Sequence, residues 1–147
     1  MKPTSRTRIG LVGCVSEKRD VITPAQDLYT STLFSGRLRF VEHTCDRWFI
    51  LSAKHGVVEP SQPLDWYDET LKGQGVAAKR TWSKKVLSQL TDLLGEDWHG
   101  FEFEFHAGAD YRDFGVEEGL RRKGALVENP VKGLGIGRQL HFYASQR

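Results

Sequence analysis

The 147-residue chain has few cysteines, little net charge and no long hydrophobic run. Cys14 and Cys45 lack the close spacing of a zinc site, so we expect free thiols, no metal and no cofactor. No apolar segment approaches the ~20 residues of a membrane helix. No secretory signal follows the basic N-terminus, so we expect a cytoplasmic protein without a membrane partner. The formal net charge of +2 does not by itself indicate a nucleic-acid partner.

Four apolar segments alternate with helical patterns, which predicts a single α/β domain over residues 1–147, with residues 1–7 flexible. The predicted strands are Ile9–Val15, Trp48–Ser52, Phe101–Phe105 and Ala125–Glu128. We expect a three-layer α/β/α arrangement around a mostly parallel four-stranded sheet, with the third predicted strand beside the first (order 2-1-3-4). Against that order, Glu102 and Glu104 alternate with phenylalanines, which indicates one solvated strand face.

The segments between the strands carry helix signals. Thr23-Pro24-Ala25-Gln26 is typical of a helix start, and Gly36 is expected to bend or interrupt that helix. The clearest helix is Val76–Leu94, which Gly95 ends. Further helices are predicted over Asp110–Lys123 and Gly133–Gln146. The stretch Lys54–Gly75 has no helical period, which predicts a long loop whose Trp66-Tyr67-Asp68 could fold over a pocket.

Polar residues gather where the predicted strands end. Ligands of open α/β sheets bind beyond the carboxyl ends of the strands, so we expect these side chains to form one pocket. The alternative is that these positions are polar only because loops are polar. The catalytic candidates are Ser52, Lys54, His55, His106 and Asp110. The substrate-binding candidates are Cys14, Ser16, Lys18, Tyr29, Ser31, Tyr67, Tyr111, Arg112, Lys132, Gly133 and Gly135.

The catalytic candidates each have a structural alternative. Histidine titrates near neutral pH and suits acid–base catalysis, but His55 could cap a turn and His106 could hydrogen-bond a carbonyl. Asp110 could activate water or cap a turn. Cys14 is a nucleophile only where its thiolate is favoured, and a buried thiol is the alternative. No serine lies in the elbow motif of the serine hydrolases.

Two basic features could bind phosphate. Lys132, with Gly133 and Gly135, opens the last predicted helix, where free N–H groups attract anions; tight packing is the other reason for the glycines. The helix Val76–Leu94 carries a basic face of Lys79, Arg80, Lys84 and Lys85. That face could contact a nucleic-acid backbone, or it could be an ordinary solvated surface.

Several motifs extend over nearly the whole chain. They are Cys14-x-Ser16-x-Lys18, Leu28-Tyr29-x-Ser31, Leu51-Ser52-Ala53-Lys54-His55-Gly56, His106-x-Gly108-x-x-Tyr111-Arg112 and Pro130-x-x-Gly133-Leu134-x-x-Gly137. With these motifs the chain resembles a widespread, uncharacterised bacterial and phage domain family.

The places of two loops also resemble the uracil-DNA glycosylase-like superfamily. In that superfamily a four-stranded parallel sheet carries one motif after its first strand and another after its fourth. Here Ser16–Asp20 and Asn129–Gly137 occupy those places, without the superfamily's Gly-Gln-Asp-Pro-Tyr and His-Pro-Ser-Pro patterns. The resemblance therefore implies the architecture and the location of the pocket, and not the substrate.

The leading hypothesis is an enzyme that acts on a nucleotide, a nucleoside or a nucleobase in nucleic acid. Cleavage or transfer at the N-glycosidic bond, as by a DNA glycosylase-like hydrolase, is the best-fitting reaction. Tyr29 or Tyr67 would stack on the base, Lys132 would hold phosphate, and His55 or His106 would assist the leaving base. The alternative is a non-catalytic module that binds a nucleotide or nucleic acid. The oligomeric state is left open.

Overall fold

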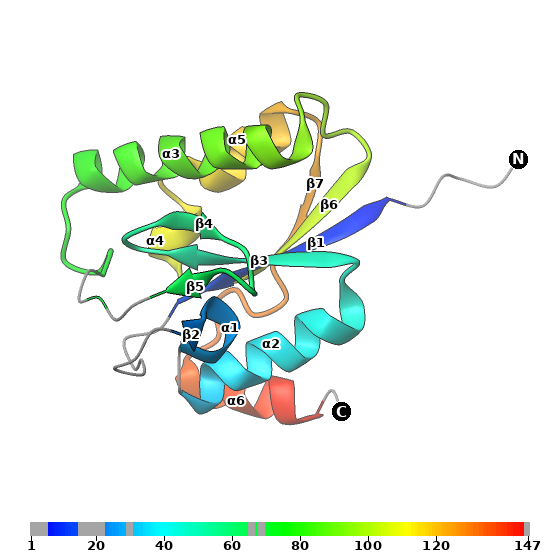
Figure 1. The fold of residues 1–147 in the computed structure, drawn as a ribbon. Helices are drawn as coiled ribbons and strands as arrows, with labels where there is room; N and C mark the ends of the chain where they lie inside the picture. The colour runs from blue at the N-terminus through cyan, green and yellow to red at the C-terminus, as the bar shows by residue number, and fades with distance from the viewer. Residues whose placement is uncertain (1–5, 15–22, 29–30, 65–66, 68–69, 146–147) are drawn as a thin grey trace, which may run out of the picture.

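The computed structural model describes residues 6–14, 23–28, 31–64, 67 and 70–145. A five-stranded sheet lies between two layers of helices (Figure 1). Helices α2 (Thr32–Thr44) and α6 (Ile136–Ser145) cover one face of the sheet. Helices α3 (Val76–Leu94) and α5 (Val116–Arg122) cover the other. The three-layer α/β/α class predicted from the sequence is confirmed.

The sheet contains five strands in the order β4-β3-β1-β6-β7. They are β1 (Thr7–Gly13), β3 (Arg47–Ser52), β4 (Gly56–Val58), β6 (Phe101–His106) and β7 (Leu126–Glu128). Leu11 of β1 pairs with Phe49 of β3 and with Phe105 of β6, both in parallel. The four predicted strands thus have the predicted order. The sheet differs in its fifth strand, β4, which pairs antiparallel with β3 at the edge.

The segment predicted as one long loop contains two short strands. Besides β4, residues Pro63–Leu64 form β5, which pairs antiparallel with β2 (Thr23–Pro24). Thr23 and Pro24 therefore lie in a strand instead of starting a helix, and α1 spans only Ala25–Leu28. Strands this short depend on their pairing partners, which a periodicity in sequence does not reveal.

Helix boundaries follow local capping. Helix α2 starts after Ser31, whose Oγ accepts a hydrogen bond from the Phe34 N–H at 3.0 Å. Gly36 lies inside α2 and does not interrupt it. Helix α3 has the predicted bounds and ends at Gly95, where φ is +85°. The predicted helix Asp110–Lys123 is divided at Gly115 (φ +134°) into α4 (Ala109–Arg112) and α5.

The chain ends differ from the predictions in detail. Residues 1–5 lie outside the described residues, and Thr7 already pairs with Phe101 in the sheet. Helix α6 begins at Ile136, after a turn in which Gly133 has a φ of +82°. None of the helices among the described residues is long and apolar enough to cross a membrane.

Two hydrophobic clusters fill the space on either side of the sheet. On the α3 side, Trp82, Val86 and Leu90 pack against the sheet residues Leu11 and Phe105. On the α2 side, the cluster includes Phe34 and Val41 of α2 with Val12 and Ile50 of the sheet. Both faces of the central strands are therefore buried, as parallel strands between helices require.

The acidic residues of β6 do not form a solvated strand face. Glu104 is only 4% exposed, although its alternation with phenylalanines predicted a solvent-facing side chain. Strand β6 is central, between β1 and β7, so α2 and α6 cover this side of it. The carboxylate is accommodated because polar groups from several elements surround it.

Candidate functional site

The order of the strands reverses between β1 and β6. The connection after β1 leads to β3 on one side, whereas the connection after β6 leads to β7 on the other. The crevice at such a switch point is where open α/β sheets bind ligands. Cys14 directly follows β1, and its Sγ lies 3.1 Å from the hydroxyl of Tyr111 in α4. A Cβ added at Gly13 would lie 2.8 Å from the Cβ of Ala107, so glycine permits this close approach.

The end of β3 forms a second part of this edge. Ser52 is buried; its Oγ donates to the Tyr67 hydroxyl at 2.8 Å and accepts from the His55 N–H at 3.1 Å. The His55 ring lies edge-on to Tyr67, with centroids 5.4 Å apart. Tyr67 is 3% exposed and packs in the hydrophobic cluster on the α2 side of the sheet. Trp66 and Asp68 lie outside the described residues.

An ion pair joins α3 to α4 at the same edge. The Lys79 Nζ lies 2.8 Å from the Asp110 carboxylate, and 4.8 Å from the centroid of the Phe114 ring. The Lys79 side chain is only 13% exposed, so it does not belong to an open basic face. Lys85 donates to the carbonyl of the exposed Lys54 at 3.1 Å. Lys79 and Lys85 are therefore held by contacts within the protein. Arg80 and Lys84 are the two remaining members of the predicted basic face.

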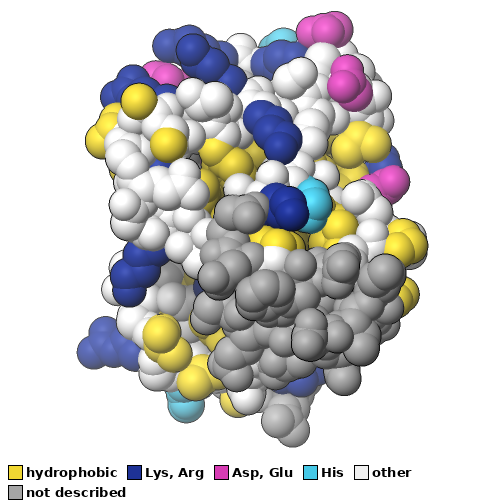
Figure 2. Space-filling view, turned by 60° about the vertical axis from the view of Figure 1, so that its left-hand side comes forward, with side chains coloured by type: hydrophobic (Ala, Val, Ile, Leu, Met, Phe, Trp, Pro, Cys, Tyr) yellow, Lys and Arg dark blue, Asp and Glu magenta, His cyan; other side chains and the backbone are white. Residues whose placement is uncertain are grey.

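An open groove of about 830 Å³ lies beside the α4–α5 connection. Its cationic lining comes from α3, α4, α5 and the segment after β7: Arg80, Arg112, Arg121, Arg122 and Lys132. Its acidic lining residues are Asp113, Glu117 and Glu118. Figure 2 looks onto the carboxyl ends of the strands, and Lys and Arg side chains are distributed over this face. The groove brings together three residues that the sequence predicted separately, namely Arg80, Arg112 and Lys132.

Arg112 is the most buried cation of the groove, at 6% exposure. Its Nε donates to the carbonyl of Ala107 at 3.2 Å, which fixes the guanidinium at the end of β6. Its Nη1 lies 3.6 Å from Asp113 Oδ1 and has no hydrogen-bond partner among the described residues. A buried guanidinium with an unused donor is suited to bind an anion.

The remaining predicted binding residues are dispersed. Ser31 is the N-cap of α2. Gly133 and Gly135 are exposed in the turn before α6, and a Cβ at either would meet no atom within 4 Å. These glycines therefore do not serve close packing among the described residues. Ser16, Lys18 and Tyr29 lie outside the described residues.

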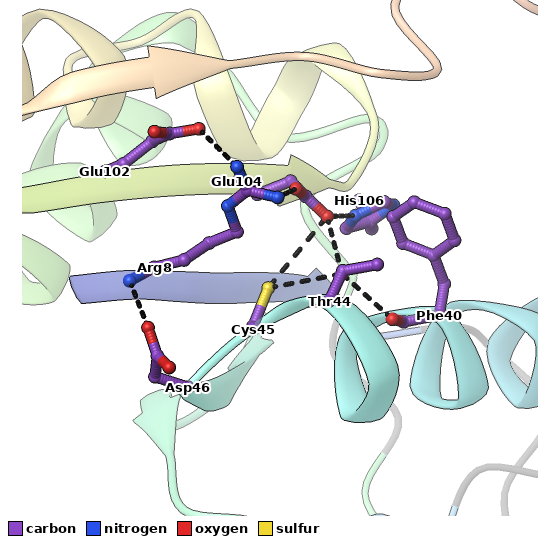
Figure 3. A network of polar contacts seen from close by, with 8 residues as sticks. All are labelled: Arg8, Phe40, Thr44, Cys45, Asp46, Glu102, Glu104 and His106. Carbon is purple, nitrogen blue, oxygen red and sulfur yellow. Dashed lines mark hydrogen bonds and ion pairs between the residues drawn. The ribbon is translucent and has the colours of Figure 1, made fainter. Parts of the chain in front are cut away.

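His106 is the last residue of β6, but its ring lies on the α2 side of the sheet. Its ring is fully buried; Nε2 lies 2.7 Å from Glu104 Oε1, and Nδ1 lies 2.7 Å from the Tyr143 hydroxyl. Figure 3 shows how Thr44, Cys45 and Arg8 gather around the same carboxylate. The Thr44 hydroxyl shares its proton between the Phe40 carbonyl at 2.9 Å and Glu104 at 3.3 Å, and the Arg8 guanidinium lies 3.7 Å from the Glu104 carboxylate.

The network fixes the protonation states of its members. Burial lowers the pKa of His106, against the opposing effect of Glu104. Burial alone would raise the pKa of Glu104, but the His106 hydrogen bond and the nearby charges outweigh it and lower that pKa. Burial raises the pKa of Tyr143 to about 12. The arrangement is thus an ionised Glu104, a neutral His106 that donates from Nε2, and a Tyr143 hydroxyl that donates to Nδ1.

Arg37 lies close enough to Tyr143 and His106 to influence the pKa of both, and it links this network to the switch-point edge. It is 6% exposed, and it donates to the Gly13 carbonyl at 3.1 Å and to the Gln139 side chain at 3.3 Å. Sequence reasoning missed Arg37. A signal was present, because Arg37 lies three residues after Phe34 and four before Val41, on the stripe of α2 that faces the sheet. Glu104 carried a signal as well, as a carboxylate in a strand expected to be central.

The chain belongs to the family of unknown function DUF6884. The model of that family matches residues 9–145, which include the cationic groove and, apart from Arg8, the network around Glu104. The predicted membership of an uncharacterised domain family is therefore confirmed. No curated protein and no solved structure matches the chain. Among the described residues, no group of three or more His, Cys, Asp or Glu side chains could hold a metal ion.

Proposed function

We propose that the protein acts on a nucleotide, or on a nucleobase within nucleic acid. Its phosphate lies in the cationic groove, and its sugar and base reach the carboxyl ends of β1 and β6. The observation that carries this proposal is the convergence of Arg80, Arg112 and Lys132 on one groove. Arg112 and Lys132 follow the adjacent parallel strands β6 and β7, so both lie at the sheet edge that bears Cys14 and Tyr111.

The state of Arg112 favours a phosphate over a neutral ligand. An unsatisfied buried donor costs about 1–3 kcal/mol, and more for a charged group. A phosphate oxygen in the groove would accept from Nη1, which now has only the 3.6 Å ion pair with Asp113. The exposed Lys132 adds a second positive charge, and guanidinium with ammonium is a common combination at phosphate sites.

The reaction that fits the edge best is cleavage or transfer at an N-glycosidic bond. Positive charge develops on the sugar as the base leaves, and a nearby carboxylate stabilises that charge. Asp110 supplies the carboxylate, held by Lys79 at 2.8 Å. The half-buried His55 donates a proton to the leaving base or orients the attacking water. His106 takes no part, because its ring is fully buried and both nitrogens are hydrogen-bonded.

Release of free base tests this proposal directly. The protein is incubated with nucleosides, nucleotides and modified DNA, and any base released is measured by chromatography. We expect release from at least one substrate, and a rate lowered about 100-fold or more in Asp110→Asn and in His55→Ala. The matched controls are Asp92→Asn on α3 and His43→Ala on α2, both exposed. Absence of release from every substrate, or full activity of Asp110→Asn, would contradict the enzymatic proposal.

The second candidate is a module that binds a nucleotide or nucleic acid without chemistry. The groove supports this binding function, because the cations of the groove are in place whether or not Asp110 and His55 are catalytic. It predicts salt-sensitive binding that Arg112→Gln or Lys132→Gln weakens, while no substrate releases base. Binding that survives both substitutions would contradict the groove as the phosphate site in either candidate function.

A further inference from the structure

A second depression continues the groove along α3 and α5. It has a volume of about 240 Å³, and five residues line both depressions: Arg80, Phe114, Gly115, Glu118 and Arg122. It also adds Lys84, one helical turn beyond Arg80 on α3. Cationic side chains therefore extend over two adjoining depressions, from Lys132 after β7 to Lys84 in α3.

The charges of this surface are unevenly engaged. Arg121 and Arg122 pair with Glu117 and Glu118 one turn earlier on α5. The Arg122–Glu118 pair is exposed on both sides, and exposed pairs of this kind contribute little to stability, so a polyanion can displace it. Within the described part of the chain, Arg80, Lys84 and Lys132 have no carboxylate partner. These three cations are available to phosphates spaced along the two depressions.

An aromatic ring lies where the two depressions meet. Phe114 lines both of them and is partly exposed, and the Lys79 ammonium lies 4.8 Å from its ring centroid. Proteins that bind single strands combine a cationic groove with aromatic rings on which unpaired bases stack. A duplex keeps its bases paired inside and cannot offer one to this ring.

We propose that a single-stranded nucleic acid is the ligand of the joined depressions, with phosphates at Lys132, Arg80 and Lys84 and a base on Phe114. This inference rests on the proposed function and narrows its substrate class. A single strand also presents an unstacked nucleotide to the sheet edge, which chemistry at an N-glycosidic bond requires. A strand can place separate phosphates at Lys132, Arg80 and Lys84, whereas a mononucleotide has a phosphate at one position only.

Binding measurements with matched ligands test the inference. The ligands are labelled oligonucleotides of one sequence, as DNA or RNA, either single-stranded or annealed to a complement. Unlabelled mononucleotides serve as competitors, and fluorescence anisotropy is read over a range of salt concentrations. We expect a single strand of at least one type to bind about tenfold or more tightly than the duplex and the mononucleotides. Equal or tighter binding of the duplex or mononucleotide would overturn the single-strand inference and leave the proposed function standing.

Two sets of variants locate the strand. Arg80→Gln with Lys84→Gln should lower the slope of log affinity against log salt by about 1.4, since each phosphate contact on a single strand contributes about 0.7. The control pair Arg39→Gln with Arg138→Gln removes the same charge from exposed positions in α2 and α6 and should leave the slope unchanged. A slope unchanged in the groove pair would place the strand elsewhere and overturn the inference.

Phe114→Leu tests the stacking contact, because leucine keeps an apolar side chain without an aromatic face. We expect about fivefold or greater weakening of single-strand binding, and near-wild-type binding in Phe114→Trp. Equal binding by the wild type, Phe114→Leu and Phe114→Trp would show that no base stacks on this ring and would overturn the inference. If no nucleotide, single strand or duplex binds at low salt, the proposed function itself fails.

Discussion

At the scale of single residues, the carboxylate of Glu104 is a buried charge that requires polar partners. Its neighbours Phe103 and Phe105 are buried on the α3 side, so Glu104 points to the opposite face of β6, under α2 and α6. An ionised carboxylate in such a place is tolerated only when hydrogen-bonded and paired. His106, Thr44 and Arg8 meet that requirement.

Glu104→Gln should therefore lower the free energy of unfolding by about 2 kcal/mol, because a charge-assisted hydrogen bond to His106 is replaced by a neutral one. Glu102→Gln is the matched control on the same strand. Its carboxylate is more exposed and, among the residues that the structure describes, pairs with Arg8 alone, at 3.3 Å, so the expected loss is below about 1 kcal/mol. Urea denaturation of both variants measures the difference. An equal loss in the two variants would show that the His106 contact contributes nothing.

At the scale of elements, the contact of α2 with α6 depends on Gly36. A Cβ at this position would lie 2.9 Å from the Cβ of Tyr143, closer than packed carbon atoms approach. The glycine therefore sets the separation of the two helices, and with it the position of the Tyr143 hydroxyl against His106. Packing between helices thus supports the polar network on the same face.

Gly36→Ala should destabilise the protein by about 1–3 kcal/mol, since the added methyl group overpacks this contact. Gly137→Ala is the opposite case in the neighbouring helix. A Cβ there meets no atom within 4 Å, and alanine favours the helix, so a gain of about 0.5–1 kcal/mol is expected. Thermal unfolding of the two variants should move in opposite directions. A stabilised Gly36→Ala would mean that α6 shifts to admit the methyl group.

The elements that were predictable from sequence are those whose pattern is complete within one segment. Helix α3 has five turns of 3.6-residue periodicity and a terminal glycine, and β1 and β3 are continuous apolar runs. Strands β4 and β5 have three and two residues, so only their partners define them. For the candidate site, the sheet edge was predictable because strand ends follow from the order of elements. The groove was not, since Arg80 and Lys132 are brought together only by tertiary packing.

At the scale of the whole molecule, the sheet separates two environments. The α3 side carries the cationic groove, the ion pair of Lys79 with Asp110, and the larger apolar cluster. The α2 side holds the buried network of Glu104, His106 and Tyr143. Arg37 connects them, because it packs under α6 and donates to the Gly13 carbonyl immediately before Cys14. The switch-point edge therefore has a buried hydrogen bond to the side of the sheet that holds the network.

The buried network makes the stability of the fold sensitive to acid. The pKa values of both His106 and Glu104 are lowered in the folded protein, relative to ordinary values of 6.5 and 4.5. The unfolded chain therefore binds more protons as the pH falls below 6.5. Stability from His106 is complete above that pH and is lost as the pH falls toward its folded pKa. Glu104 adds a second loss below 4.5.

We expect the free energy of unfolding to fall by up to about 1.4 kcal/mol per pH unit through His106 below pH 6.5. Urea denaturation between neutral and mildly acidic pH measures the slope, which His106→Gln should reduce. His141→Gln, on the exposed surface of α6, is the control and should retain it. Nitrogen NMR of the folded protein gives an independent reading, because the His106 ring should stay neutral with its proton on Nε2 at pH values where an ordinary histidine is half protonated. A His106 ring that takes up its second proton at or above pH 6.5 would contradict the assigned network.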